Sequence, residues 1–222
     1  MPPKSISTKA PRPYQSVLRQ QQAEATRNRI LQVAGELFAA DGYARTTVAG
    51  IASAAGVSAE TVQGQGTKAV LFINAMDYVA VGVVGEDDVL NLDLGRTLVS
   101  FTELAPALDY GVTVIADLNG RVAPMYAALV GGANSEPKLR DYLRELFVNI
   151  TAQQRRLLDV YRERGWLRDD IPFDEIVETA AVLSSVETYL HITARDGRSV
   201  DHYRQWLRRM LALTVYAKPH ES

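Results

Sequence analysis

Residues 46–68 read TTVAGIASAAGVSAETVQGQGTK, and their hydroxyls, small residues and glycines predict two short helices joined by a tight turn. Thr46 or Thr47 can cap the first helix with its hydroxyl, and Gly56 can end it in the left-handed conformation that glycine readily adopts. Ser58 is placed to cap the second helix. This pattern is typical of a helix-turn-helix, although an αα-hairpin inside a helical bundle would produce the same local signals.

The segments on both sides of this stretch carry apolar residues at helical spacing. Before it, Gly42 is expected to end a helix whose apolar face is formed by Ile30, Leu31, Ala34, Leu37 and Phe38. After it, Thr67 begins a helix whose apolar side is formed by Leu71, Phe72, Ala75, Met76 and Val79. The helix that begins after Ser58 should be brief, because Gly64 and Gly66 are poor helix formers.

The residues at fixed spacing over about residues 26–72 resemble the tetracycline-repressor (TetR) family of bacterial transcription regulators. The resemblance rests on Ile30-Leu31-x-x-Ala34-x-x-Leu37-Phe38, Asp41-Gly42-Tyr43, Thr46-Thr47-Val48, Ile51-Ala52, Ala55-Gly56-Val57-Ser58, Thr61-Val62, and Lys68 with Leu71-Phe72. It implies an all-α homodimer with a helix-turn-helix DNA-binding domain, which we place in residues 14–85. Residues 1–13 are rich in proline and polar groups, and this composition predicts a disordered arm before that domain. Residues 86–222 would form a helical domain that dimerises and binds a small-molecule effector of unknown identity. The implied function is a ligand-responsive repressor that binds a pseudo-palindromic operator in double-stranded DNA.

The same resemblance assigns the residues that would contact DNA. Hydroxyls and helix N-termini donate to phosphate oxygens, a lysine adds a positive charge, and glutamine can pair with adenine. The phosphate contacts would come from Thr46, Thr47 and Lys68, and the groove-facing residues would be Ser58, Ala59, Glu60, Thr61, Gln63 and Gly64, followed by Gln65. The alternative for Thr46 and Ser58 is that they only cap helices, and an acid such as Glu60 is more often repelled by DNA than used.

One departure from the family pattern affects this assignment. The family usually has a tyrosine after the threonine-valine pair, then a histidine or tyrosine followed by phenylalanine. Here Gln63 replaces the tyrosine, and the phenylalanine that anchors the helix is missing before Gly64. We therefore expect a recognition helix that is shorter and less firmly packed, with Gln63 as the hypothetical base or phosphate contact.

The remainder of the chain reads as successive helices, expected near residues 96–105, 107–130, 136–164, 173–194 and 199–217, with no sheet. The expected breaks are marked by Pro106, Gly131-Gly132, Pro137, Gly165, Pro172 and Gly197. If the chain follows the family, large residues on these helices line the ligand pocket, and the candidates are Phe101, Tyr110, Met125, Tyr126, Leu129, Trp166 and Tyr189. The last two helices are the expected dimer interface, through the small residues Ala180, Ala181, Ser184, Ser185 and Thr188. The alternatives are that the large residues are core and that the small face packs inside one subunit.

Charge and composition favour a protein that contacts an anion with one end. Residues 1–68 carry a net charge of +4 and residues 69–222 carry −6. Cysteine is absent, and no apolar run approaches the roughly 18 residues that cross a membrane, so we expect a cytoplasmic protein without a membrane partner. The three histidines lack metal-site spacing and no nucleophile motif is present, so we expect no cofactor, no metal and no enzymatic activity. The alternative function is a module that shares the fold and binds small molecules or partners without sequence-specific DNA binding.

Overall fold

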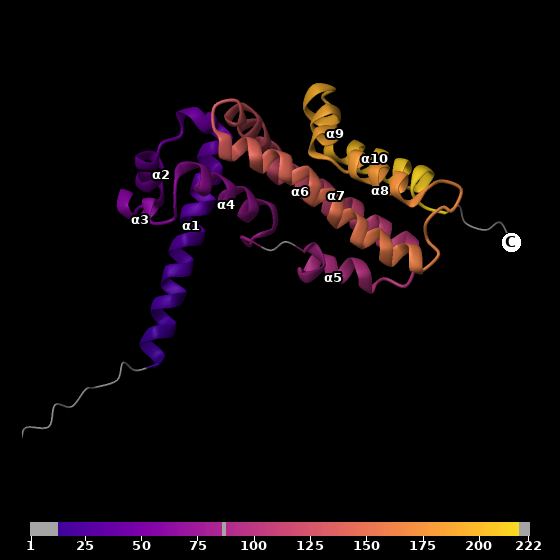
Figure 1. Ribbon diagram of the computed structural model, residues 1–222, viewed down its shortest axis with the longest axis horizontal. Coiled ribbons are helices and arrows are strands. Elements are labelled where there is room, and N and C mark those ends of the chain that lie inside the picture. Colours follow the sequence, from indigo (N-terminus) through magenta and orange to yellow (C-terminus); the bar gives the residue numbers. More distant parts are fainter. Residues whose placement is uncertain (1–12, 86–87, 218–222) are drawn as a thin grey trace, which may run out of the picture.

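The computed structural model describes residues 13–85 and 88–217, and these residues form an all-helical protein (Figure 1). Within these ranges β-structure is limited to one isolated bridge, between Leu167 and Tyr216. The all-α fold class is therefore confirmed. The helices are α1 (Pro13–Arg45), α2 (Val48–Ala55), α3 (Ala59–Gln63), α4 (Lys68–Val81), α5 (Asp93–Ser100), α6 (Leu104–Ala133), α7 (Pro137–Glu163), α8 (Phe173–Leu183), α9 (Val186–Leu190) and α10 (Val200–Thr214), with a 3₁₀ turn (Val89–Asn91) and a π-helical turn (His191–Arg195).

Helices α1 to α4 gather at one end of the molecule, and the N-terminal half of α1 projects away from it (Figure 1). The core of this end is aromatic: the rings of Phe38 and Phe72 lie 4.8 Å apart, and Tyr43 packs against both. Gly42 interrupts the helical conformation of α1 with φ +79°, as its predicted role at a helix end requires. Residues 1–12 of the predicted N-terminal arm lie outside the described residues, and Pro13, its last residue, begins α1.

Helix α6 is the central element of the body. It contacts α1, α4, α5, α7, α9 and α10 and runs alongside α7 down the length of the molecule (Figure 1). Pro106 was expected to separate two helices, but it lies in the first turn of α6, where the missing N–H costs nothing. Gly131 and Gly132 were expected to break the chain, but α6 continues through them to Ala133.

The helix expected over residues 173–194 is in fact two helices, α8 and α9, and this expectation was wrong. Asn119 of α6 donates a hydrogen bond of 3.0 Å to the carbonyl of Ser184, and Ser185 is extended and accepts from the N–H of Thr188 with its hydroxyl. The amide of Asn119 thus satisfies a carbonyl at the end of α8, and Ser185 caps the helix that follows, α9, so the chain forms two helices here.

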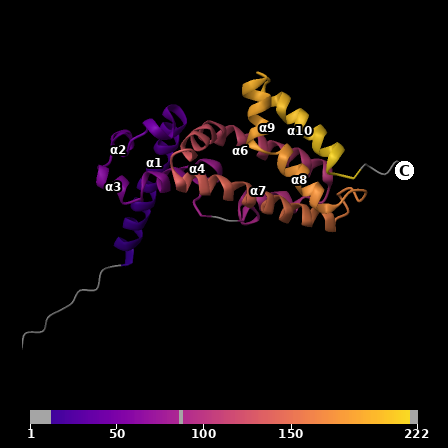
Figure 2. The ribbon, with the colours of Figure 1, turned by 45° about the horizontal axis from the view of Figure 1, so that its top comes forward.

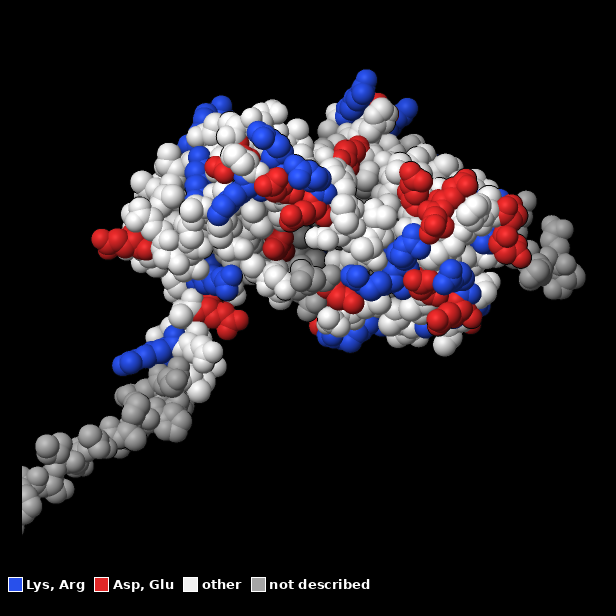
Figure 3. Space-filling model, viewed as in Figure 1, with Lys and Arg blue, Asp and Glu red and all other residues white. Residues whose placement is uncertain are grey.

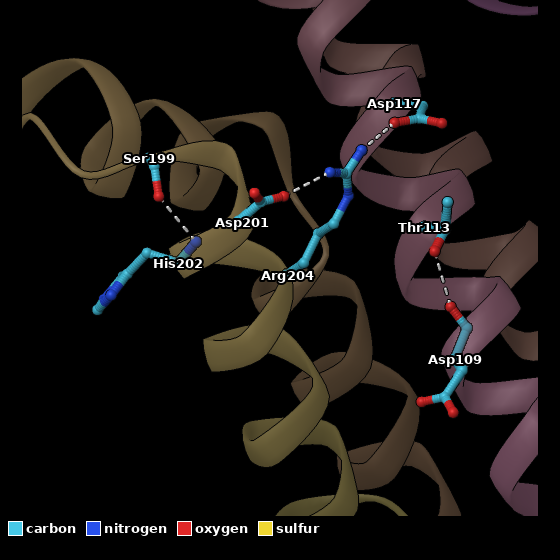
Figure 4. A network of polar contacts seen from close by, with 7 residues as sticks. All are labelled: Asp109, Thr113, Asp117, Ser199, Asp201, His202 and Arg204. Atoms are coloured by element: carbon cyan, nitrogen blue, oxygen red, sulfur yellow. Dashed lines mark hydrogen bonds and ion pairs between the residues drawn. The ribbon is translucent and has the colours of Figure 1, made fainter.

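Helices α8 and α10 lie side by side on one flank of the body, as both ribbon views show (Figures 1 and 2). Charged side chains attach α10 to α6: Arg204 donates to Asp117 of α6 at 2.6 Å and to Asp201 of α10 at 2.8 Å (Figure 4). Arg208 donates to Asp109, also on α6. None of the helices in the described ranges combines the length and apolar character needed to cross a bilayer.

Candidate functional site: nucleic-acid interface and internal cavity

The turn between α2 and α3 has the geometry that the sequence predicts. Thr47 caps α2 by accepting from the N–H of Gly50 at 3.0 Å, and Ser58 caps α3 by accepting from the N–H of Thr61 at 3.1 Å. Gly56 adopts the left-handed conformation, with φ +65°, and ends α2. These local devices fix two short helices in sequence with a tight turn between them.

Thr46, one of two alternative caps for α2, has a different role. Its side chain is buried, and its hydroxyl donates to the carbonyl oxygens of Leu37 and Gly42 at 3.2 and 2.9 Å. Thr46 therefore closes the C-terminal end of α1, because helix ends leave carbonyls without partners inside the helix. A phosphate contact through this buried hydroxyl would require the loss of these bonds.

Helix α3 has only five residues, as its glycines predict, and Val62 is its one buried residue. The exposed members of the predicted DNA surface are Thr47, Ser58, Ala59, Glu60, Thr61, Gln63 and Gly64, while Gln65 is half-buried. The structure thus brings these residues onto one outward-facing segment. Gly66 follows with φ +120°, and a Cβ there would lie 2.9 Å from Cγ1 of Val70, so the chain turns sharply into α4.

Lys68, at the first position of α4, is held against the end of α1. Its ammonium donates to the carbonyl of Ala44 at 3.3 Å and lies 4.4 Å from the ring centroid of Tyr43. Partial burial lowers the pKa of Lys68, and the carboxylate of Glu136 opposes that shift. Arg45, exposed at the end of α1 beside these residues, was missed as a candidate contact; the positive charge of residues 1–68 was the signal that could have found it.

A cavity of about 820 Å³ lies among α4, α5, α6, α7, α8 and α9. Aliphatic side chains form most of its wall, and tyrosines and a few charged groups complete it. The polar and charged residues of the wall include Asp77 on α4, Tyr142 and Arg155 on α7, Glu178 on α8 and Glu187 on α9. Its size is that of a small-molecule site.

Of the predicted pocket residues, Tyr126 alone is among those that line this cavity. Its hydroxyl donates to Glu187, and burial followed by that hydrogen bond raises the pKa of Tyr126. The other six pack elsewhere: Leu129 and Met125 in the core, Phe101 against Tyr110, Trp166 against Tyr161, and Tyr189 against Tyr203. Helical spacing identifies buried faces, and it does not distinguish a side chain that faces a cavity from one that fills the core.

The small residues predicted for the dimer interface also meet this cavity. Ala180 is buried within the subunit, and it lines the cavity together with Ala181, Ser184 and Ser185. Thr188 is half-buried and donates to the carbonyl of Val182 at 2.7 Å. Ala180 therefore packs inside one subunit, which was the alternative to a place in the dimer interface.

Polar contacts within the described residues connect the α1–α4 end to the body. The hydroxyl of Tyr43 donates to Glu136 at 3.3 Å. Burial, followed by the nearby carboxylate of Glu136, raises the pKa of Tyr43 to about 12. Tyr142 of α7 donates to Asp77 of α4 at 2.9 Å. Arg121 of α6 donates to the carbonyl of Ala80, near the end of α4, at 2.8 Å.

Acidic and basic side chains stand side by side over the α6–α10 body on the face shown in Figure 3. The ion pairs of the body include Arg155 with Asp174, at 2.6 Å, and Arg162 with Asp159, at 2.7 Å. The described residues contain no group of three or more His, Cys, Asp or Glu side chains that could hold a metal ion.

Comparison with known proteins agrees with this architecture. Residues 30–63 match the family model described as bacterial regulatory proteins, tetR family, and no curated protein matches the chain by sequence. A transcriptional regulator from Saccharomonospora viridis, solved in complex with choline, shares 21% identity over 88% of this chain and 100% of its own, with a TM-score of 0.64.

Two further solved structures share the fold. A TetR-family transcriptional regulator from Syntrophomonas wolfei has 12% identity over 86% of this chain and 95% of its own, with a TM-score of 0.67. NalD, the secondary repressor of the MexAB-OprM multidrug efflux pump in Pseudomonas aeruginosa, has 18% identity over 90% of this chain and 100% of its own, with a TM-score of 0.63. The resemblance predicted from residues 26–72 is thus confirmed by the tetR family model over residues 30–63, and the solved structures show that this chain shares the fold of TetR-family regulators.

Proposed function

We propose that this protein is a ligand-responsive transcriptional repressor that binds a pseudo-palindromic DNA operator as a homodimer and releases it when a small molecule occupies the cavity. It would act in the cytoplasm as a regulator and not as an enzyme. The family match supports DNA binding, and the cavity supports the ligand response. Two proteins of the same fold add to this support, since one is solved with choline and the other is named as a repressor.

The observation that carries the proposal is the position of α4. Its first residue, Lys68, follows the α2–α3 surface directly, and its second half contributes Met76, Asp77, Ala80 and Val81 to the cavity wall. A ligand that displaces this half of α4 must also move the helix start beside the DNA surface, because a helix of 14 residues transmits displacement along its length.

Close packing makes α4 responsive to small displacements. Gly35 of α1 lies where a Cβ would be 2.8 Å from Cγ2 of Val79 on α4 and 3.4 Å from the sulfur of Met125 on α6. Three helices therefore meet at one glycine without free space. Packed elements of this kind shift between discrete arrangements and do not deform continuously.

For DNA contact we assign the exposed residues of the α2–α3 segment to the major groove and Thr47, Lys68 and Arg45 to phosphates. Gln63 carries the hypothesis of a base contact, because it is exposed and sits at the last position of α3. Glu60 is exposed beside it, and its negative charge argues against a phosphate contact.

Dimerisation is assigned to α8 and α10, which are parts of the interface predicted over residues 173–194 and 199–217. Val182 on α8 and Leu213 on α10 are 60% and 64% exposed, and the two helices lie side by side (Figure 2). Apolar side chains that are exposed on adjacent helices are typical of a protein–protein interface. The assignment predicts that Leu213→Lys weakens self-association, measured by sedimentation, while leaving the helical content unchanged.

The test is selection of bound sequences from a random DNA pool with the full-length chain, followed by anisotropy titrations on the selected site. An inverted repeat is the expected product. Lys68→Ala should reduce the slope of log affinity against log salt by about 1, since one phosphate contact releases about one counterion. Arg198→Ala is the matched control: it removes one exposed positive charge from the loop before α10, far from α3, and should leave the slope unchanged.

Gln63→Ala tests the base contact separately. A bidentate base contact contributes about 1–3 kcal/mol, so the variant should bind the selected site roughly 5- to 150-fold more weakly. Binding as tight as that of the parent chain would remove Gln63 from the interface. Enrichment of no inverted repeat would instead favour the fold-sharing module that lacks sequence-specific DNA binding.

A further inference from the structure

Resting on the DNA binding proposed above, we infer that residues 17–29 of α1, the projecting segment, form a second DNA contact. Their arginines bind the phosphate backbone of the duplex next to the base pairs that α3 contacts. This contact carries no sequence information, because the phosphates are the same at every base pair. The distribution of charge, the exposure of the segment and its position in the fold support it.

The positive charge of the N-terminal region is concentrated before the helix-turn-helix. Residues 1–29 contain six Lys or Arg residues and one acidic residue, a net charge of +5, whereas residues 30–68 contain two basic and three acidic residues, a net charge of −1. Helices α2 and α3 and the start of α4 therefore offer little net attraction to a polyanion. Attraction to phosphates supplies essentially all of the non-specific affinity of DNA-binding proteins, and residues 1–29 are its main source in this chain.

The basic residues of the projecting segment are Arg19, Arg27 and Arg29. All three side chains are exposed, and within the described residues no ion pair or hydrogen bond compensates their charge. At about 100° per residue they fall within an arc of about 160° around the helix, and Glu24, the acidic residue of the segment, lies outside that arc. One half of the segment is therefore positively charged and free to meet an anion.

The projecting segment is exposed on all sides along most of its length. Every side chain from Val17 to Ala25 is exposed, and the first buried residue of α1 is Ile30. Even the apolar Val17 and Leu18 are 53% and 46% exposed. Most of the stability of a helix in a protein comes from tertiary packing, so a partner surface would stabilise this segment. Its charge makes a polyanion the complementary partner.

The projecting segment lies at the end of the molecule that carries α3. In both ribbon views α3 and the projecting half of α1 lie at the end opposite α10 (Figures 1 and 2). A helical segment over residues 17–29 extends about 20 Å, which equals about six base pairs of B-DNA. This length allows the arginines to reach phosphates beyond the base pairs that the five-residue α3 contacts.

The salt dependence of DNA binding tests this contact with the double variant Arg19→Gln/Arg27→Gln of the full-length chain. The slope of log affinity against log salt should fall by about 2 for each bound subunit, since each phosphate contact releases about one counterion. At about 0.1 M salt the affinity should fall roughly tenfold for each lost contact. The matched control is Arg195→Gln/Arg198→Gln, which removes two exposed charges between α9 and α10 and should leave the slope unchanged. Equal slopes for the two double variants overturn the inference.

Two comparisons between DNA molecules locate the contact. The loss of affinity should be equal on the selected site and on a random-sequence duplex, whereas Gln63→Ala should affect the selected site alone. The loss should disappear on a duplex that ends at the inverted repeat and return when about ten base pairs, roughly one helical turn, are added at each side. A loss confined to the selected site assigns the arginines to bases, and a full loss on the short duplex places them inside the repeat. Either result refutes a backbone contact outside the repeat.

The outcomes separate this contact from the proposed function. If an inverted repeat is selected and Arg19→Gln/Arg27→Gln binds it like the parent chain, the proposed function stands and the second contact is wrong. If no repeat is enriched and this variant binds random duplexes more weakly than the control, the second contact stands and sequence-specific repression is wrong. Changed self-association with unchanged DNA binding assigns the arginines to a second copy of the chain, and it also refutes the DNA contact.

Discussion

Gly131 and Gly132 are adjacent in α6, and replacing each of them by alanine should have opposite effects on the stability of the protein. A Cβ on Gly132 would lie 2.7 Å from Cδ1 of Leu139 and 3.0 Å from Cβ and Cγ of Tyr43, whereas a Cβ on Gly131 would meet no heavy atom within 4 Å. Gly132 is buried where α6 contacts the end of α1, and Gly131 is exposed. The two glycines therefore lie in the same helix but differ in how closely other residues pack against them.

The magnitude follows from two opposing contributions. Alanine in place of glycine stabilises a helix by about 0.5–1 kcal/mol, and both variants receive this gain. Gly132→Ala also overpacks the junction with Tyr43 and Leu139, which costs about 1–3 kcal/mol. Because the helix gain is common to both, the free energy of unfolding should differ between the two variants by about 1–3 kcal/mol.

The assay is urea and thermal unfolding followed by circular dichroism, with all proteins at one concentration because a dimer's stability depends on it. A difference of about 2 kcal/mol corresponds to a Tm difference of about 4–8 °C in a chain of this size. Equal stabilisation by Gly131→Ala and Gly132→Ala would show that the junction has room for a methyl group, and it would refute the close packing of α6 on α1.

Two further predictions concern the break between α8 and α9 and the alkaline limit of stability. Ser185→Ala should lower the free energy of unfolding by about 1 kcal/mol, because it removes the cap of α9. The control Ser184→Ala should change the free energy of unfolding by less than about 0.5 kcal/mol. Equal effects of the two substitutions in urea unfolding would contradict the capping assignment. Burial is the main cause that raises the pKa values of Tyr43, Tyr161 and Tyr203 to about 12, so the folded state favours their protonated forms. The contribution of these phenols to the free energy of unfolding is therefore fully present below pH about 10 and is lost as the pH rises toward 12. Phenolate absorbance and circular dichroism measured together from pH 9 to 12 check this; complete ionisation of the tyrosines near pH 10 in a protein that stays helical would contradict it.

Much of the α1–α4 end could be predicted because its determinants are local. The caps formed by Thr47 and Ser58, the left-handed Gly56 and the brevity of α3 each depend on residues within one helical turn. The same is true of the family pattern, since it is a set of residue types at fixed spacing. Local chemistry of this kind can be read directly from a sequence.

The cavity and its lining could not be predicted in the same way. Periodicity identified Met125, Tyr126 and Leu129 as inward-facing residues of one helix, but only the packing of α6 against its neighbours separates the cavity-lining Tyr126 from the core residues Met125 and Leu129. Asp77 and Tyr142 are 65 positions apart, and no local signal connects them. Their meeting depends on how α4 and α7 pack.

The sequence by itself determined the helix-turn-helix, the all-α class and the resemblance to the tetR family, because caps, glycines and apolar spacing act over a few residues. Tertiary structure decided that Thr46 closes α1, that Asn119 and Ser185 divide the helix expected over residues 173–194, and that α4 joins the predicted DNA surface to the cavity. These outcomes depend on contacts between distant segments. Such contacts form only when whole helices pack, so the short-range preferences of a sequence do not specify them.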